Sequence, residues 1–133
     1  MMLLDTSAVL GYLKNEPGKE LIESALLTGQ ACISHVNQAE VISKLLDWGL
    51  SFDEAQQALG KLALASEPFS TETAHETARL RPLTRAHGLS LGDRACLATA
   101  RLRQHQVLTG DRDWLKLANT LGLTIVSFRP AAQ

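Results

Sequence analysis

The sequence predicts an α/β protein in which short parallel strands alternate with helices. Three observations support this prediction: short apolar segments recur along the chain, helical segments separate them, and turn-forming residues lie at the boundaries. The length of 133 residues suits one domain with a substantial core. An apolar content of 45% and a charged content of 20% argue against disorder. We therefore expect a single domain over residues 1–133, with a flexible tail at 129–133.

The first half of the chain should contribute two buried strands and four helices. Residues 1–5 form the first strand, and Asp5 or Thr6 can cap a helix that continues to about Leu13. Glycines stop the next two helices, and a serine-to-glutamate capping box starts the fourth. These further elements are a helix at 18–28, a strand at 31–34, a helix at 36–48 and a helix at 51–64.

The second half should add three strands and three helices. Residues 67–69 are a weak strand candidate, because Pro68 lacks the N–H group that a paired strand donates. Pro82 should disturb a helix that begins near Thr71 and stops near Gly88. The remaining elements are a helix at 90–104 with the apolar stripe Leu91, Ala95, Ala98 and Leu102, a strand at 106–109, a helix at 113–119 and a strand at 123–128.

Four acidic residues occupy places that a parallel sheet would bring together. Asp5 and Asp111 follow predicted strands, and Glu40 and Asp93 lie near the starts of helices that face the same edge. Ligands bind beyond the carboxyl ends of the strands in such sheets. Carboxylates in one cleft repel each other until they are protonated or a cation binds, and Mg²⁺ prefers such oxygen ligands together with water and phosphate. The sequence therefore favours a metal-dependent phosphodiesterase.

Each acid also has an ordinary structural explanation. Asp5 and Asp111 can each cap a helix, and Asp93 suits the third position of a capped helix. Glu40 can pair with Lys44 one helical turn later. These explanations account for the residues singly but not for a set that points to one edge of the sheet.

Several neighbours of the acids are candidates for supporting roles. Thr6, Ser7 and Thr109 can orient Asp5 or bind a metal-bound water, although Thr6 and Ser7 can equally serve as helix caps. Asp113 can replace or assist Asp111, since one residue separates them. These residues are accessory candidates beside the four acids.

The arginines are distributed unevenly, although the net charge is only −1. All eight lie in the second half of the chain, where most can be explained as solvated helix faces. Arg94 and Arg112 each follow a candidate carboxylate directly, and the guanidinium group can donate two hydrogen bonds to one phosphate. We therefore expect these two to contact substrate phosphate.

The cysteines and the N-terminal segment indicate the cellular setting. Cys32 and Cys96 are isolated and the four histidines show no ligand spacing, so neither a zinc site nor a disulfide framework is indicated. The apolar segment before Asp5 is too short for a signal peptide or a membrane span. A reducing cytoplasm is the expected location.

Four segments of the chain resemble the motifs of PIN-domain ribonucleases, particularly the VapC-like toxins of type II toxin–antitoxin pairs. The run Leu3–Val9 resembles the opening of that family, and Val36–Leu46 its second motif. Leu89–Ala100 and Leu108–Trp114 are similar to the third and fourth. The motifs occur in the expected order with compact spacing and cover nearly the whole chain.

The resemblance implies a single PIN-like domain with a five-stranded parallel sheet sandwiched between helices. It also implies that Asp5, Glu40, Asp93 and Asp111 bind one or two Mg²⁺ or Mn²⁺ ions. The expected reaction is hydrolysis of RNA to 5′-phosphate and 3′-hydroxyl ends, by a homodimer that a cognate antitoxin inhibits.

Other functions remain open at this level. A free-standing PIN-domain nuclease for RNA processing and a non-catalytic partner-binding α/β module are alternatives. A phosphatase that forms an aspartyl-phosphate is disfavoured, because its second aspartate would fall at Ser7.

Overall fold

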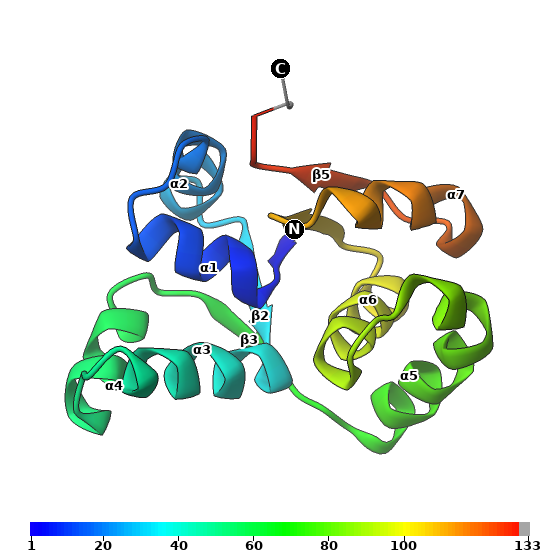
Figure 1. Cartoon of the computed structure of the whole chain (residues 1–133), viewed down its shortest axis with the longest axis horizontal. Coiled ribbons are helices and arrows are strands. Elements are labelled where there is room, and N and C mark those ends of the chain that lie inside the picture. The colour runs from blue at the N-terminus through cyan, green and yellow to red at the C-terminus, as the bar shows by residue number, and fades with distance from the viewer. Residues whose placement is uncertain (131–133) are drawn as a thin grey trace.

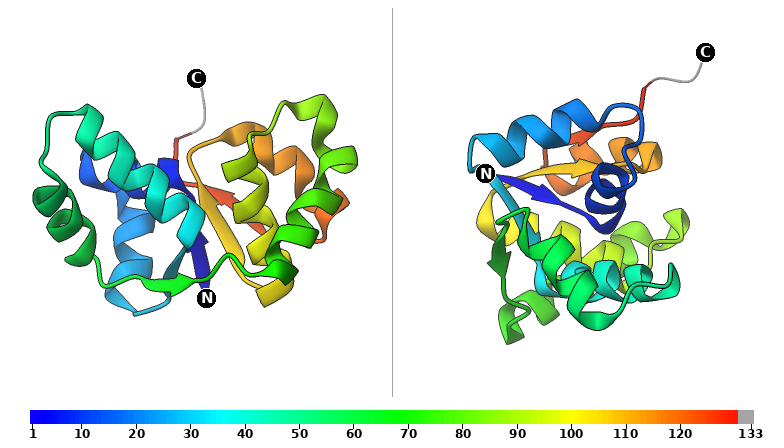
Figure 2. Two further views of the ribbon diagram at one scale, coloured as in Figure 1. Left: turned by 90° about the horizontal axis from the view of Figure 1, so that it is seen from below. Right: turned by 90° about the vertical axis from the view of Figure 1, so that its left-hand side faces the viewer.

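The computed structural model describes residues 1–130 and shows an α/β fold built on a five-stranded parallel sheet (Figures 1 and 2). The strands are β1 (Met2–Leu4), β2 (Ala31–Ser34), β3 (Ala65–Glu67), β4 (Gln106–Thr109) and β5 (Ile125–Ser127). The α-helices are α1 (Thr6–Leu13), α2 (Lys19–Leu27), α3 (His35–Asp47), α4 (Phe52–Gly60), α5 (Thr71–Thr84), α6 (Leu91–Arg103) and α7 (Ala118–Leu121). Two 3₁₀ helices, η1 (Arg85–His87) and η2 (Arg112–Leu117), follow α5 and β4.

The strand order places a topological switch point beside the central strand. The order is β3-β2-β1-β4-β5, so the chain builds outward from β1 to β3 and then crosses to the other side of β1. Leu3 of β1 pairs with Cys32 on one side and Val107 on the other. Ligand sites in open parallel sheets lie at such a point, beyond the carboxyl ends of the strands.

Helices cover both faces of the sheet. Figures 1 and 2 show α1 to α4 grouped on one side and α5, α6 and α7 on the other. Successive strand residues point to opposite faces, so Leu3 packs into one core cluster with Leu97 of α6. Leu4 packs into the other cluster with Val9 and Val41. The predicted sheet with helices on both faces is therefore confirmed.

Three element predictions are corrected by the structure. β3 precedes Pro68 rather than including it, because proline cannot donate to the ladder. α4 ends at Gly60 instead of residue 64, and Ala63 adopts a φ of 53°. α5 continues through Pro82, which lies near its C-terminal end where few helix hydrogen bonds remain to be lost.

The predicted apolar stripe of α6 is also wrong at its first position, because the side chain of Leu91 is 59% exposed. The buried residues are instead Gly92 and a continuous run from Ala95 to Ala100. α6 packs between the sheet and α5, so residues on most sides of it are covered and the simple 3.6-residue pattern is lost.

The end of the described chain is held by Arg129. Its Nε donates to the carbonyl of Gly110 at 2.8 Å, and its Nη1 lies 2.7 Å from a carboxylate oxygen of Glu16. Of the tail expected at 129–133, residues 131–133 lie outside the described residues. Among the helices of residues 1–130, none has the length and apolar character that crossing a membrane requires.

Candidate functional site

All four acids singled out in the sequence face one cavity. It has a volume of about 390 Å³ and lies at the carboxyl ends of β1 and β4. Asp5 follows β1, Asp111 follows β4, Glu40 comes from α3 and Asp93 from the first turn of α6. The lining residues are Asp5, Thr6, Ser7, Leu10, Glu40, Lys44, Asp93, Asp111 and Trp114.

Asp5 lies buried in this cavity and caps α1 at the same time. Its Oδ1 accepts a hydrogen bond from the backbone N–H of Ala8 at 2.8 Å. The whole residue is only 4% exposed. Burial raises the pKa of Asp5 to about 6, although hydrogen bonds from Thr109, Ser7 and Ala8 oppose that rise. The charge of Asp93 makes a small contribution to the same rise. Asp5 is therefore a carboxylate that a nearby cation would stabilise in its charged form.

Two hydroxyl groups connect Asp5 to the loop after β4. Thr109 Oγ1 donates to Asp5 Oδ2 at 2.6 Å and accepts from the backbone N–H of Asp111 at 3.0 Å. Ser7 Oγ donates to Asp5 Oδ1 at 2.7 Å and accepts from the N–H of Gly110 at 2.8 Å. The two side chains thereby fix Asp5 and the start of the Asp111 loop relative to each other.

Glu40 is oriented by neighbours other than Lys44. Its Oε1 accepts hydrogen bonds from Thr6 Oγ1 at 2.6 Å and from Asn37 Nδ2 at 2.8 Å. Asn37 is buried, and its Oδ1 accepts from Ser34 Oγ at 2.7 Å, which fixes the orientation of the amide. Lys44 lines the cavity, but within residues 1–130 no hydrogen bond or ion pair joins it to Glu40.

Asn37 is a supporting residue that the sequence interpretation missed. It precedes Glu40 by three positions in α3, and residues with this spacing share one face of a helix. That spacing was the signal available in the sequence. A buried polar side chain at Asn37 is explained by the hydrogen bonds it makes to Ser34, Thr6 and Glu40.

Asp93 and Asp111 complete the acidic set, and each also takes part in capping a helix. Asp93 Oδ2 accepts from the N–H of Ser90 at 3.1 Å in a capping box, and Asp111 Oδ1 accepts from the N–H of Asp113 at 3.0 Å. Burial raises the pKa of Asp93, hydrogen bonds from Ser90 oppose the rise, and the charges of Glu40 and Asp111 add to it. Asp93 is therefore electrostatically linked to two other acids of the cavity.

The remaining candidates lie outside the acidic cavity. The side chain of Asp113 is 80% exposed and lies 3.7 Å from Lys116. Asp113 and Arg112 line an adjoining cavity of about 430 Å³, which Ser7 and Asp111 share. Arg94 lies apart from both cavities among the described residues, because its Nη1 donates to the carbonyl of Thr77 in α5 at 3.2 Å.

Gly92 lets α6 approach the carboxylate of Glu40. A Cβ atom added at Gly92 would lie 2.6 Å from Glu40 Cδ, closer than real Cβ contacts allow. A side chain at this position would therefore displace the Glu40 carboxylate from its place in the cavity.

Replacing Gly92 by Ala should displace the Glu40 carboxylate and weaken Mn²⁺ binding by about 10- to 100-fold, as misplacing a metal ligand through its neighbours does. Isothermal titration with Mn²⁺ measures the effect. Gly60→Ala is the matched control, because Gly60 is also helical and an added Cβ there meets nothing within 4 Å. Equal affinities in the two variants would contradict this role of Gly92.

The chemistry of the cavity suits a hard divalent cation. Its donor atoms are carboxylate oxygens, which Mg²⁺ and Mn²⁺ prefer over sulfur or nitrogen. Burial, with a smaller contribution from neighbouring charges, raises the pKa of Asp5 and Asp93, and such an ion would stabilise their charged forms.

Comparison with known proteins identifies the family. The PIN domain family model matches residues 2–120. The fold is similar to a chain of a toxin–antitoxin complex from Klebsiella pneumoniae, with 20% identity over 98% of this chain and 100% of that chain and a TM-score of 0.77. It is also similar to a chain in VapBC2 from Rickettsia felis bound to a promoter DNA fragment, with 16% identity over 95% of this chain and 97% of that chain and a TM-score of 0.73. A third similar chain is in VapBC-5 from Mycobacterium tuberculosis, with 23% identity over 94% of this chain and 96% of that chain and a TM-score of 0.64. No curated protein sequence matched. The chain belongs to the PIN domain family.

Proposed function

We propose that this protein is a Mg²⁺- or Mn²⁺-dependent endoribonuclease that acts in the cytoplasm as the toxin of a toxin–antitoxin pair. The observation that carries the proposal is the convergence of Asp5, Glu40, Asp93 and Asp111 on one cavity at the switch point of the sheet. Membership of the PIN family and the similarity of the fold to chains from toxin–antitoxin complexes support it.

In the proposed reaction, these four carboxylates hold the cation and neighbouring side chains hold the carboxylates. Thr109 and Ser7 keep Asp5 in place, while Thr6 and Asn37 do the same for Glu40. A divalent cation held by these residues would lower the pKa of the attacking water and offset charge on the leaving oxygen. The water oxygen bonds to phosphorus as the bond from phosphorus to the 3′ oxygen breaks. The attacking water loses a proton to solvent and the released 3′ oxygen takes one up, which leaves 3′-hydroxyl and 5′-phosphate ends.

Incubation of the purified protein with total cellular RNA tests the activity. We expect cleavage with Mg²⁺ or Mn²⁺, no cleavage with EDTA, and recovery when the metal is added back in excess. The products should carry 5′-phosphates that allow ligation or digestion by a 5′-phosphate-dependent exonuclease. Cleavage in EDTA, or 2′,3′-cyclic phosphate ends, would instead indicate attack by the 2′-hydroxyl and would contradict the proposed chemistry.

The toxin role is separated from RNA processing by a second test. Expression of the protein in a bacterial host should arrest growth, and co-expression of a small partner encoded immediately upstream should restore it. Asp93→Asn should not arrest growth. If the wild-type protein cleaves RNA but leaves growth unaffected, a free-standing processing nuclease becomes the better proposal. The proposed homodimer is tested by light scattering.

Arg112 is proposed to contact the RNA phosphate beside the acids, because it is exposed and lines the adjoining cavity with Asp111. Arg112→Gln should weaken binding of single-stranded RNA and reduce the salt dependence by about 0.7 in the log–log slope, as loss of one phosphate contact does. Fluorescence anisotropy in EDTA measures binding without cleavage. Arg85→Gln, an exposed arginine of η1, is the control, and an equal effect of both substitutions would count against a specific contact.

A further inference from the structure

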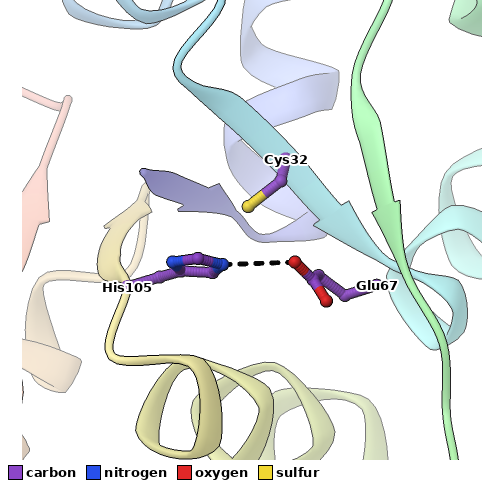
Figure 3. A group of neighbouring side chains, drawn as sticks. All are labelled: Cys32, Glu67 and His105. Atoms are coloured by element: carbon purple, nitrogen blue, oxygen red, sulfur yellow. Dashed lines mark hydrogen bonds and ion pairs between the residues drawn. The ribbon is translucent and has the colours of Figure 1, made fainter.

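A second group of metal-binding side chains lies apart from the acidic cavity (Figure 3). It contains Cys32 of β2, Glu67 at the end of β3 and His105 between α6 and β4. The Cys32 sulfur, a Glu67 carboxylate oxygen and a His105 ring nitrogen all lie within 4.8 Å of one another. Figure 3 shows the three side chains directed toward a common point from separate parts of the chain.

We propose that Cys32, Glu67 and His105 form a binding site for a zinc-like divalent cation, independent of the proposed nuclease site. Thiolate and imidazole are preferred ligands of Zn²⁺, and a carboxylate completes sets of this kind. Mg²⁺ avoids sulfur ligands, so the two sites select different ions by their chemistry. A thiolate and a carboxylate together also balance the two positive charges of the ion.

The arrangement needs only small movements to bind such an ion. Ligands placed about 2.0–2.3 Å from a tetrahedral Zn²⁺ lie about 3.3–3.8 Å from one another. His105 Nε2 and Glu67 Oε1 are already 3.2 Å apart. The three ligand atoms all lie within 4.8 Å of one another. They therefore need to approach each other by at most roughly 1 Å to reach the spacing of tetrahedral zinc ligands. Rotation of the Cys32 side chain requires loss of only a weak sulfur hydrogen bond to the Met2 carbonyl.

Glu67 is held in place without losing the oxygen that a metal would use. Its Oε1 faces His105, while its Oε2 lies 3.4 Å from Arg103 Nε. A partner on the outer oxygen of a ligating carboxylate is a common way to fix its orientation. Arg103 therefore supports the carboxylate from outside the group.

The group is covered but reachable from solvent. The side chains of His105 and Glu67 are 13% and 19% exposed, and Cys32 is fully buried. His105 also lines a cavity of about 520 Å³ between the end of α6 and the segment before β5. The three ligands would leave a fourth position to water, which can enter from this side.

Binding requires a proton to leave the cysteine. Burial raises the pKa of the Cys32 thiol to about 11, and the nearby charge of Glu67 adds to the rise. The ion displaces the thiol proton to solvent as the bond from sulfur to metal forms, and His105 binds through Nε2 with its proton on Nδ1. A bound cation reverses the unfavourable charge interaction between Cys32 and Glu67.

The structural consequence is a link between an edge strand and the rest of the sheet. β3 is a three-residue edge strand, and Ala65 and Ser66 in it are exposed. An ion on Glu67, Cys32 and His105 joins β3 to β2 and to the start of β4. Because the site exists only in the folded chain, the ion stabilises the native state by mass action.

Titration of the metal-free full-length protein with Co²⁺ and Zn²⁺ tests the proposal. We expect one thiolate-bound Co²⁺ per chain, identified by thiolate-to-cobalt charge-transfer absorption in the near ultraviolet, whatever Co²⁺ the acidic cavity also binds. Zn²⁺ should displace this Co²⁺ and raise the melting temperature. Cys32→Ser should remove this absorption. His105→Gln should weaken Zn²⁺ binding by at least about 100-fold. Loss of a residue that only orients a ligand costs up to about 100-fold in metal affinity, and loss of a ligand itself should cost at least as much.

Two controls separate this site from others. Cys96→Ser changes the other buried cysteine and should keep the absorption, as should Asp93→Asn in the acidic cavity. If Cys32→Ser fails to fold by circular dichroism, the partly exposed His105 position decides the test. The proposal is wrong if the wild-type protein shows no thiolate-to-cobalt absorption, or if Zn²⁺ affinity is unchanged in His105→Gln.

Discussion

Asp93→Asn should abolish metal-dependent RNA cleavage, lowering its rate by at least about 100-fold because catalysis by a bound cation is worth several kcal/mol. Asn can still accept the hydrogen bond from Ser90, so the capping box and the fold should survive. Asp5→Asn should have an equally large effect, since Asp5 lies in the same cavity. Cleavage rates at saturating Mg²⁺ measure both losses, with circular dichroism as the check on folding.

Substitutions at other aspartates test whether the loss of activity is specific to the acids of the cavity. Asp53→Asn, in the exposed first turn of α4, should retain full activity. Asp111→Asn should lower activity more than Asp113→Asn, because Asp111 lines the acidic cavity whereas Asp113 lies outside it, beside Lys116. Wild-type activity in Asp93→Asn would remove the proposed mechanism.

The second large effect is on stability and its dependence on pH. The pKa of Asp5 is about 6 in the folded protein against 3.8 ordinarily, so between these values the folded state binds more protons than the unfolded state. The contribution of Asp5 to stability therefore falls as pH rises through this window, by about 3 kcal/mol in total. Asp5→Asn removes that loss. In EDTA, its unfolding free energy relative to wild type should increase by about 2 kcal/mol from about pH 4 to about pH 7.5.

Urea unfolding at the two pH values measures this difference, and Asp53→Asn again serves as the control. Added Mn²⁺ should raise the stability of the wild-type protein at neutral pH and leave Asp5→Asn nearly unchanged, because the cation offsets the charge of Asp5. A stability difference that stays constant with pH would show that Asp5 ionises normally and would contradict its unfavourable burial.

The sequence allowed the four acids to be identified because three of their positions follow from parallel-sheet geometry. Asp5 and Asp111 come after β1 and β4, and Asp93 lies in the first turn of α6 at the same edge. The capping explanations proved correct as well, since Asp5 and Asp111 are N-caps and Asp93 is the third residue of a capping box that Ser90 begins. Capping and clustering are compatible here, because helices that begin at the carboxyl edge of a sheet place their capping carboxylates at that edge.

Other features depend on tertiary contacts that no local pattern contains. The pairing of β1 with β4 depends on the crossover of the chain, and the contact of Gly92 with Glu40 depends on how α3 meets α6. The approach of Cys32 to His105 follows from the same topology rather than from sequence spacing. Ala95 and Ala98 of the predicted α6 stripe are buried and Leu91 is exposed. Residues outside the stripe are buried as well, because neighbours cover α6 on more than one side.

Isothermal titration of Mn²⁺ into the wild-type protein, Asp5→Asn and Asp93→Asn at neutral pH tests the central claim most directly. The convergence of the acids on one cavity predicts binding by the wild-type chain and loss of that binding in each variant, with the fold retained. No binding by the wild-type protein, or equal affinity in all three proteins, would contradict the claim that these carboxylates together hold a divalent cation.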